Sequence, residues 1–116
     1  MDAVPRPAPA KSELLPGTLE MLVLHALTLG PMHGYAIGQH IAQLSESVLQ
    51  VEQGSLYPAL ERLQAKGWVT SKWGVTPTKR RARFYTITAA GRKQMGKEVS
   101  SFDRVLLAIN RVMRRA

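Results

Sequence analysis

The sequence contains no cysteine. This absence excludes a disulfide framework, a thiol nucleophile and a cysteine-ligated zinc ion, and it fits a protein of a reducing cytoplasm. Long hydrophobic runs are also missing: the most apolar segment, residues 19–29, is interrupted by Glu20, His25 and Thr28 and is shorter than the roughly 18 residues of a spanning helix. The first fifteen residues contain no apolar run typical of a signal peptide. We therefore expect a soluble, cytoplasmic protein that does not enter a membrane.

Acidic residues are scarce, and basic residues are missing from much of the first half of the chain. Eight Asp and Glu stand against sixteen Lys and Arg, which gives a formal net charge of +8. No Lys or Arg occurs from Leu14 to Gln53, whereas fourteen of the sixteen lie at or after Arg62. Such a charge favours a polyanionic partner, although a basic surface can also serve solubility alone. The second half of the chain is therefore predicted to carry the binding face.

Catalytic and metal-binding patterns are absent as well. The eight acids are scattered, and neither a Ser-His-Asp order nor a glycine-rich phosphate loop can be assembled. His25, His33 and His40 have no carboxylate or thiol converging with them in the sequence, and His25 falls in a helix expected to be buried. We expect no enzyme activity, no metal and no cofactor.

With 116 residues, the chain fits one domain. Residues 1–15 contain three prolines and are predicted to form a flexible tail. A first helix is predicted from an N-cap at Thr18 to a stop at Gly30, and its apolar face comprises Leu19, Leu22, Val23, Ala26 and Leu27. A second helix, within residues 33–44, is expected to bury a stripe made of Ile37, Ile41 and Leu44.

The segment GSLYPALERLQAKGWV, residues 54–69, predicts a third helix that ends near Gly67. Its leucines recur at helical spacing and face the core, namely Leu56, Leu60 and Leu63. Polar and aromatic side chains are left on the outside, namely Ser55, Tyr57, Pro58 and Glu61. Two helix starts remain open, because Pro58 is harmless in a first turn after Ser55 but deprives the Gly54 carbonyl of its partner if the helix begins near Glu52.

Two β-prone runs, WVTSKWG and RFYTIT, are separated by VTPTKRRA and predict a hairpin with a long basic tip. Trp68 and Trp73 flank the first run and are expected to pack within the strands. Thr88 is predicted to cap a final helix with a heptad-like apolar seam, which comprises Met95, Val99, Phe102, Leu106, Ile109 and Met113. This seam favours dimerisation, and the alternative is a helix that packs back on its own domain.

Three helices followed by a basic hairpin are typical of a winged helix-turn-helix. The fold class expected is mainly α with a small β-hairpin, divided into a tail (1–15), a winged helix-turn-helix domain (16–88) and a C-terminal dimerisation helix (89–116). In such a fold the third helix enters the major groove, where Gln53, Ser55 and Tyr57 offer groups for base edges and phosphates. The electrostatic attraction is assigned to the four basic residues among positions 79 to 83, namely Lys79, Arg80, Arg81 and Arg83.

The motifs HGYAI, GSLYPALERLQAKGWV and RRARFYTITAAGR resemble the PadR family of transcriptional regulators over roughly residues 14–95. The resemblance implies a dimeric repressor that binds double-stranded DNA at a pseudo-palindromic operator and responds to a small molecule or other signal. It adds Tyr35 to the expected DNA contacts. A single helix after the wing is similar to the shorter subgroup with multidrug-sensing members, in which an aromatic residue of this helix binds planar ligands. Phe102 would hold that place, or two Phe102 rings simply fill a dimer interface.

Two other classes of function remain open on the sequence alone. A winged helix can bind RNA, which offers the same phosphates, or the chain can be a protein-interaction adaptor with a merely solvated wing.

Overall fold

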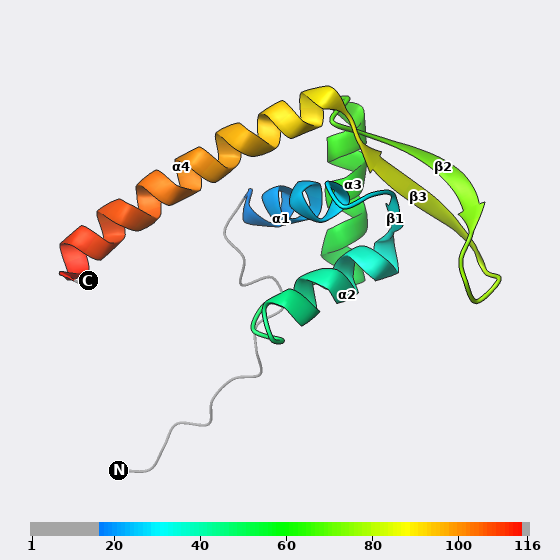
Figure 1. Ribbon diagram of the computed structural model, residues 1–116, viewed down its shortest axis with the longest axis horizontal. Coiled ribbons are helices and arrows are strands. Elements are labelled where there is room, and N and C mark those ends of the chain that lie inside the picture. The colour runs from blue at the N-terminus through cyan, green and yellow to red at the C-terminus, as the bar shows by residue number, and fades with distance from the viewer. Residues whose placement is uncertain (1–16, 115–116) are drawn as a thin grey trace, which may run out of the picture.

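The computed structural model describes residues 17–114, so the predicted tail at residues 1–15 lies outside the described part, as do residues 115–116. The chain is mainly helical with one small sheet, and the expected fold class is confirmed (Figure 1). Its elements are α1 (Thr18–Leu27), β1 (Met32–His33), α2 (Gly34–Leu44), α3 (Gln53–Ala65), β2 (Val69–Val75), β3 (Arg81–Ile87) and α4 (Ala89–Met113).

The core lies where α1, α2 and α3 meet the base of the sheet. Its largest fully buried side chains are Leu24, Leu27, Ile37, Leu56, Leu60, Leu63, Val23 and Val69. The inward face predicted for the third helix is therefore confirmed. On α1, Leu19 and Leu22 pack against this core while Leu24 lies within it, so the buried face is broader than the predicted one.

The ends of α1 and the stripe of α2 differ from prediction. Gly17, with φ of 87°, is the N-cap of α1, and Thr18 is its first helical residue. The helix ends at Leu27 rather than at Gly30. In α2, Ile37 and Ile41 are buried, but Leu44 is 70% exposed. Leu44 is the last residue of the helix, and the chain then turns so that Leu49 and Val51 pack against the core instead.

The start of α3 settles the position of Pro58. The helix begins at Gln53 with Glu52 as N-cap, so Pro58 lies inside it rather than in a first turn after Ser55. Because proline has no N–H, the Gly54 carbonyl has no amide to accept from four residues later. The helix stops at Ala65, and Gly67 adopts φ of 77°, as the predicted stop requires.

The sheet has three strands in the order β1-β3-β2. β2 and β3 form an antiparallel hairpin, and β1 pairs with the other edge of β3 at Phe84 and Tyr85. The short β1 was not predicted. The hairpin tip is also shorter than expected, because Val75 belongs to β2 and Arg81 and Ala82 belong to β3. A compact turn closes it, in which the Thr76 amide donates to the Arg80 carbonyl at 2.8 Å.

Helix α4 leaves the base of the hairpin, packs its first half against α1, and extends away from the body on the side opposite the hairpin tip (Figure 1). The Thr88 cap is confirmed, since its Oγ1 accepts from the Gly91 amide at 3.0 Å. A β-carbon at Gly91 would overlap the Trp68 carbonyl oxygen, so this close approach requires glycine. From residue 100 to 114 every side chain except that of Asn110 is exposed, so this half does not pack back on its own domain. None of the helices within residues 17–114 is long and apolar enough to cross a membrane.

Candidate nucleic-acid interface

The outer face of α3 carries the side chains expected to meet DNA. Tyr57 is 42% exposed, and Gln53, Pro58 and Glu61 are exposed as well. Ser55 was expected on the outside but is half-buried. The two N-terminal turns of α3 therefore offer an amide and a phenol to solvent, with a hydroxyl beside them.

Tyr57 also packs on α2. A β-carbon built on Gly34 would lie 2.7 Å from the Tyr57 hydroxyl oxygen and 2.9 Å from two carbons of its ring. The ring therefore lies directly over the first residue of α2, and only glycine leaves it this space. This contact fixes the Tyr57 ring between the two helices.

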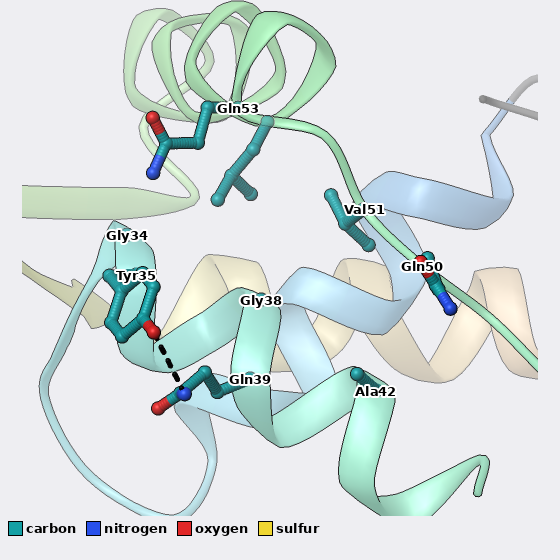
Figure 2. A pocket seen from close by; sticks show the side chains of 9 residues that line it. Gly34, Tyr35, Gly38, Gln39, Ala42, Gln50, Val51 and Gln53 are labelled. Carbon is teal, nitrogen blue, oxygen red and sulfur yellow. Dashed lines mark hydrogen bonds between the residues drawn. The ribbon is translucent and has the colours of Figure 1, made fainter. Parts of the chain in front are cut away.

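A shallow hollow of about 230 Å³ lies between α2 and the N-terminal part of α3 (Figure 2). Gly38, Ala42 and Val51 supply much of its apolar lining. At its edge Tyr35 is 58% exposed, and its hydroxyl accepts a hydrogen bond from Gln39 Nε2 at 3.0 Å. Tyr35 from α2 and Gln53 from α3, both predicted to contact DNA, thus line the same hollow.

The wing, defined here as residues 69–87, carries five cations, of which Lys72 lies alone on β2 and the other four form two groups. Lys79 and Arg80 lie in the tip turn and are exposed, and Lys79 adopts a left-handed φ of 64°. Arg81 and Arg83 point from β3 onto the ring of Trp73, with their Cζ atoms 4.5 Å and 5.3 Å from its centroid. Cation–π stacking of this kind holds the guanidinium groups along one face of the hairpin.

The base of the wing is hydrogen-bonded to α3. Ser71 Oγ accepts from Arg83 Nη2 at 2.9 Å and donates to Gln64 Oε1 at 2.9 Å. A polar groove lies beside this contact, between α3 and β3, and Glu61 and Tyr85 line it together with Gln64 and Arg83. Burial raises the pKa of the Tyr85 hydroxyl, and the Arg83 charge partly opposes that rise. The wing and α3 are thus joined by polar side chains.

Comparison with known proteins decides the family. Residues 23–97 match the profile described as the transcriptional regulator PadR-like family. The chain belongs to this family. It is a family of transcriptional regulators, not of enzymes.

Similar proteins extend the comparison. The PadR-like chain is 43% identical over 86 residues to an uncharacterised 37.1 kDa protein in a transposon of Streptomyces fradiae. The aligned region makes up 74% of this chain and 23% of that protein. It is 25% identical over 77 residues to the negative transcriptional regulator PadR of Bacillus subtilis, and the aligned region makes up 66% of this chain and 42% of that regulator. The chain therefore spans less than half the length of these two relatives.

Two solved structures share the fold over most of their length. A transcriptional regulator from Clostridium thermocellum has a TM-score of 0.73 and 26% identity, with 79% of this chain and 89% of that one covered. A PadR family regulator from Eggerthella lenta has a TM-score of 0.72 and 27% identity, with 84% and 82% covered.

The PadR-like fold separates the expected DNA contacts into two clusters. Tyr35, Gln53, Ser55 and Tyr57 gather where α2 meets α3, whereas Lys79 and Arg80 lie at the tip of seven-residue strands. The base of the hairpin follows the C-terminal end of α3, and its tip lies at the far end of both strands.

Sequence reasoning missed Gln64, Ser71 and the role of Trp73. Trp68 packs against the core as expected, but Trp73 is 53% exposed and carries arginines on its face. The period-two alternation of a hairpin was the available signal, since it places Ser71 and Trp73 on one face of β2. Using that signal requires the register, in which Trp73 pairs with Arg83.

Two of the three histidines show how these residues are placed in the fold. His33 caps α2 by accepting from the Ala36 amide at its Nδ1, and its ring meets Phe84 edge-on at 5.3 Å. His25 was expected in a buried setting, but its side chain is exposed because it lies on the outward side of α1. Among residues 17–114, no three His, Cys, Asp or Glu side chains gather as a metal site would require.

Proposed function

We propose that this PadR-like regulator binds double-stranded DNA sequence-specifically as a homodimer and represses transcription from a pseudo-palindromic operator in the cytoplasm. The observation that carries the proposal is the pairing of a solvent-facing polar surface on α3 with a cationic wing. Repression is supported by the name of the Bacillus subtilis relative, a negative transcriptional regulator.

In this proposal the N-terminal turns of α3 enter the major groove. Gln53 has the amide that pairs with adenine, and Ser55 can bond to base edges or phosphate. Tyr57 and Tyr35 donate their hydroxyl protons to phosphate oxygens, which sets the register of the helix on the duplex. The packing of Tyr57 on Gly34 supports this role because it holds the phenol in one place.

The wing supplies the electrostatic attraction. Arg62 of α3 is already paired with Glu20 at 2.8 Å, so it contributes little free positive charge to the groove. Lys79, Arg80, Arg81 and Arg83 are exposed and are proposed to neutralise phosphates. Each neutralised phosphate releases condensed counterions, so affinity should fall with salt.

Helix α4 is proposed to form the dimer. From Phe102 onward its apolar stripe is exposed in a single chain, from 39% at Phe102 to 59% at Met113. At the start of the stripe, Met95 packs against the core of its own chain and Val99 is half-buried. A contiguous apolar patch of this kind marks an interaction site, and a two-fold axis lets the same patch cover itself. The interface residues proposed are Met95, Val99, Phe102, Leu106, Ile109 and Met113. The dimer then presents two α3 helices to two half-sites.

A small-molecule effector is proposed to bind at the dimer seam. Phe102 is the aromatic residue of α4, and in a two-fold dimer its symmetry mate lies near it. Two facing rings can bracket a planar, apolar ligand. Such a ligand would change the angle between the two α4 helices and thereby the spacing of the α3 helices.

The proposal is tested by a gel shift of the intact protein with the DNA upstream of its own gene. Scrambled duplex and single-stranded RNA of equal length serve as competitors. We expect a complex that scrambled duplex and RNA displace poorly. Equal displacement by RNA would support an RNA-binding protein, and no complex with any nucleic acid would support an adaptor.

A further inference from the structure

Three polar side chains from three elements form one hydrogen-bonded chain between the recognition helix α3 and the wing. Ser71 Oγ of β2 is at its centre. It donates to Gln64 Oε1 of α3 at 2.9 Å and accepts from Arg83 of β3, at 3.2 Å from Nε and 2.9 Å from Nη2. We call Gln64, Ser71 and Arg83 the wing strut.

The strut lies where the wing leaves the body of the protein. β1 supports β3 only at Phe84 and Tyr85, and Ser71 is the β2 partner of Tyr85. From there to the tip the wing is a two-stranded ribbon, and a two-stranded hairpin without further support is marginally stable in water. The direction of the tip relative to α3 therefore depends on what holds the ribbon at this point.

Arg83 keeps free hydrogen-bond donors for DNA while it takes part in the strut. A guanidinium has five N–H donors, and the hydrogen bonds to Ser71 use Nε and one on Nη2. The Trp73 ring, whose centroid lies 5.3 Å from Arg83 Cζ, covers the guanidinium from a second direction. Three N–H donors therefore remain for a phosphate, on a group whose orientation is fixed.

We propose that Ser71 is a positioning residue for DNA binding: with Gln64, it orients Arg83 and fixes the angle between the wing and α3. This rests on the proposed function, in which both elements contact the same duplex. Holding two contact surfaces in the bound arrangement lowers the ordering cost of association. Ser71 carries no charge, so its contribution acts through the position of others and not through phosphate neutralisation.

The test compares Ser71→Ala with Thr70→Val in salt titrations of DNA affinity. Thr70 is the neighbouring β2 residue on the opposite face, and its hydroxyl has no hydrogen-bond partner among residues 17–114, so Thr70→Val removes a hydroxyl from the same strand without touching the strut. We expect Ser71→Ala to weaken binding about 3- to 10-fold, the loss for one freed side chain. Its log–log salt slope should equal that of the parent, because no charge is lost.

A double-mutant cycle with Arg83→Gln separates positioning from an independent effect. Arg83→Gln should weaken binding and reduce the salt slope by about one contact. Adding Ser71→Ala to that background should have little further effect, because Ser71 then has no guanidinium to orient. Losses that multiply in the cycle would overturn the proposal, as would a Ser71→Ala affinity equal to that of Thr70→Val.

A measurement without DNA provides a second criterion. Backbone amide order parameters of residues 76–80 should fall in Ser71→Ala and stay at the parent values in Thr70→Val. Unchanged tip order in Ser71→Ala would contradict the strut even if affinity fell. Failure of the proposed function looks different, since the parent protein itself would then show no salt-dependent DNA binding.

Discussion

The ring of Tyr57 lies so close to Gly34 that a β-carbon on Gly34 would be 2.7 Å from the Tyr57 hydroxyl oxygen. Gly34 opens α2 and Tyr57 lies on the outer face of α3, so this contact joins the two helices of the helix-turn-helix at the surface proposed to meet DNA. It explains why a small residue begins α2 and why an exposed tyrosine has a fixed place.

Gly34→Ala should move the Tyr57 ring. The displaced atoms are the end of a side chain that can rotate outward, so the free energy of unfolding should change by less than about 1 kcal/mol. DNA affinity should fall about as much as in Tyr57→Ala, because the phenol leaves its place. Calorimetry and fluorescence anisotropy measure the two effects.

Gly38→Ala in the same helix is the matched control. A β-carbon there meets only the Val51 carbonyl oxygen at 4.0 Å, so it fits without displacement. Alanine stabilises a helix interior relative to glycine by about 1 kcal/mol. Gly38→Ala should therefore raise the melting temperature. Equal DNA affinity in Gly34→Ala and the parent would contradict a DNA-contacting role for Tyr57.

Lys79→Asn separates the charge of the wing tip from its backbone geometry. Lys79 has φ of 64°, a conformation that asparagine tolerates, so the turn should keep its shape. The log–log salt slope of DNA binding should fall by about 0.9 for the lost phosphate contact. Lys97→Gln removes an exposed cation from α4, away from the wing, and should leave the slope unchanged. If Lys79→Asn and Lys97→Gln had the same salt slope, the slope would depend on the net charge of the protein and not on a phosphate contact of Lys79.

The buried face of α3 was predictable, whereas the end of α2 and the presence of β1 were not. Leu56, Leu60 and Leu63 recur at helical spacing over two turns, and this spacing predicts a helix with one buried face. Leu44 continues the same kind of stripe on α2, but the stripe does not say where the helix ends. β1 has two residues, too few for any periodicity to reveal it.

The candidate site was predictable in its residue types and less so in its connections. The exposure of Lys79 and Arg80 was predictable, because basic residues in a hairpin turn face solvent. Ser71 and Gln64 were not, since their meeting depends on hairpin register and on how β2 docks beside α3. Contacts between elements of this kind follow from tertiary packing, which local sequence patterns do not encode.

Leu106→Glu should separate the proposed dimer. Leu106 is 44% exposed and takes no part in the core, so the monomer should remain folded. A charge in the middle of a self-complementary apolar seam would be buried without a partner, which strongly disfavours association. Sedimentation velocity at micromolar concentration should give a dimer for the parent and a monomer for the variant.

Ser100→Glu is the control for this change, since it adds the same charge on the opposite side of α4. It should leave the dimer intact. A parent protein that sediments as a folded monomer would contradict the proposed interface.

Phe102→Ala tests the effector site. If two Phe102 rings bracket planar ligands, planar cationic dyes should bind the parent dimer and lose up to about tenfold in affinity in the variant, as expected for loss of an aromatic contact of about 0.5–1.5 kcal/mol. Isothermal titration calorimetry on dimers verified by sedimentation measures this loss. No dye binding by the parent, or equal affinity in both proteins, would make Phe102 a packing residue of the interface.

The most direct test of a dimeric, sequence-specific DNA-binding regulator is selection of bound duplexes from a random library by the intact protein, followed by sequencing. Two α3 helices related by a two-fold axis should enrich an inverted repeat, with half-site centres about one helical turn, 10–10.5 base pairs, or a multiple of it apart. Enrichment of a single unrepeated site would contradict the dimer, and a library that stays random would contradict sequence-specific binding.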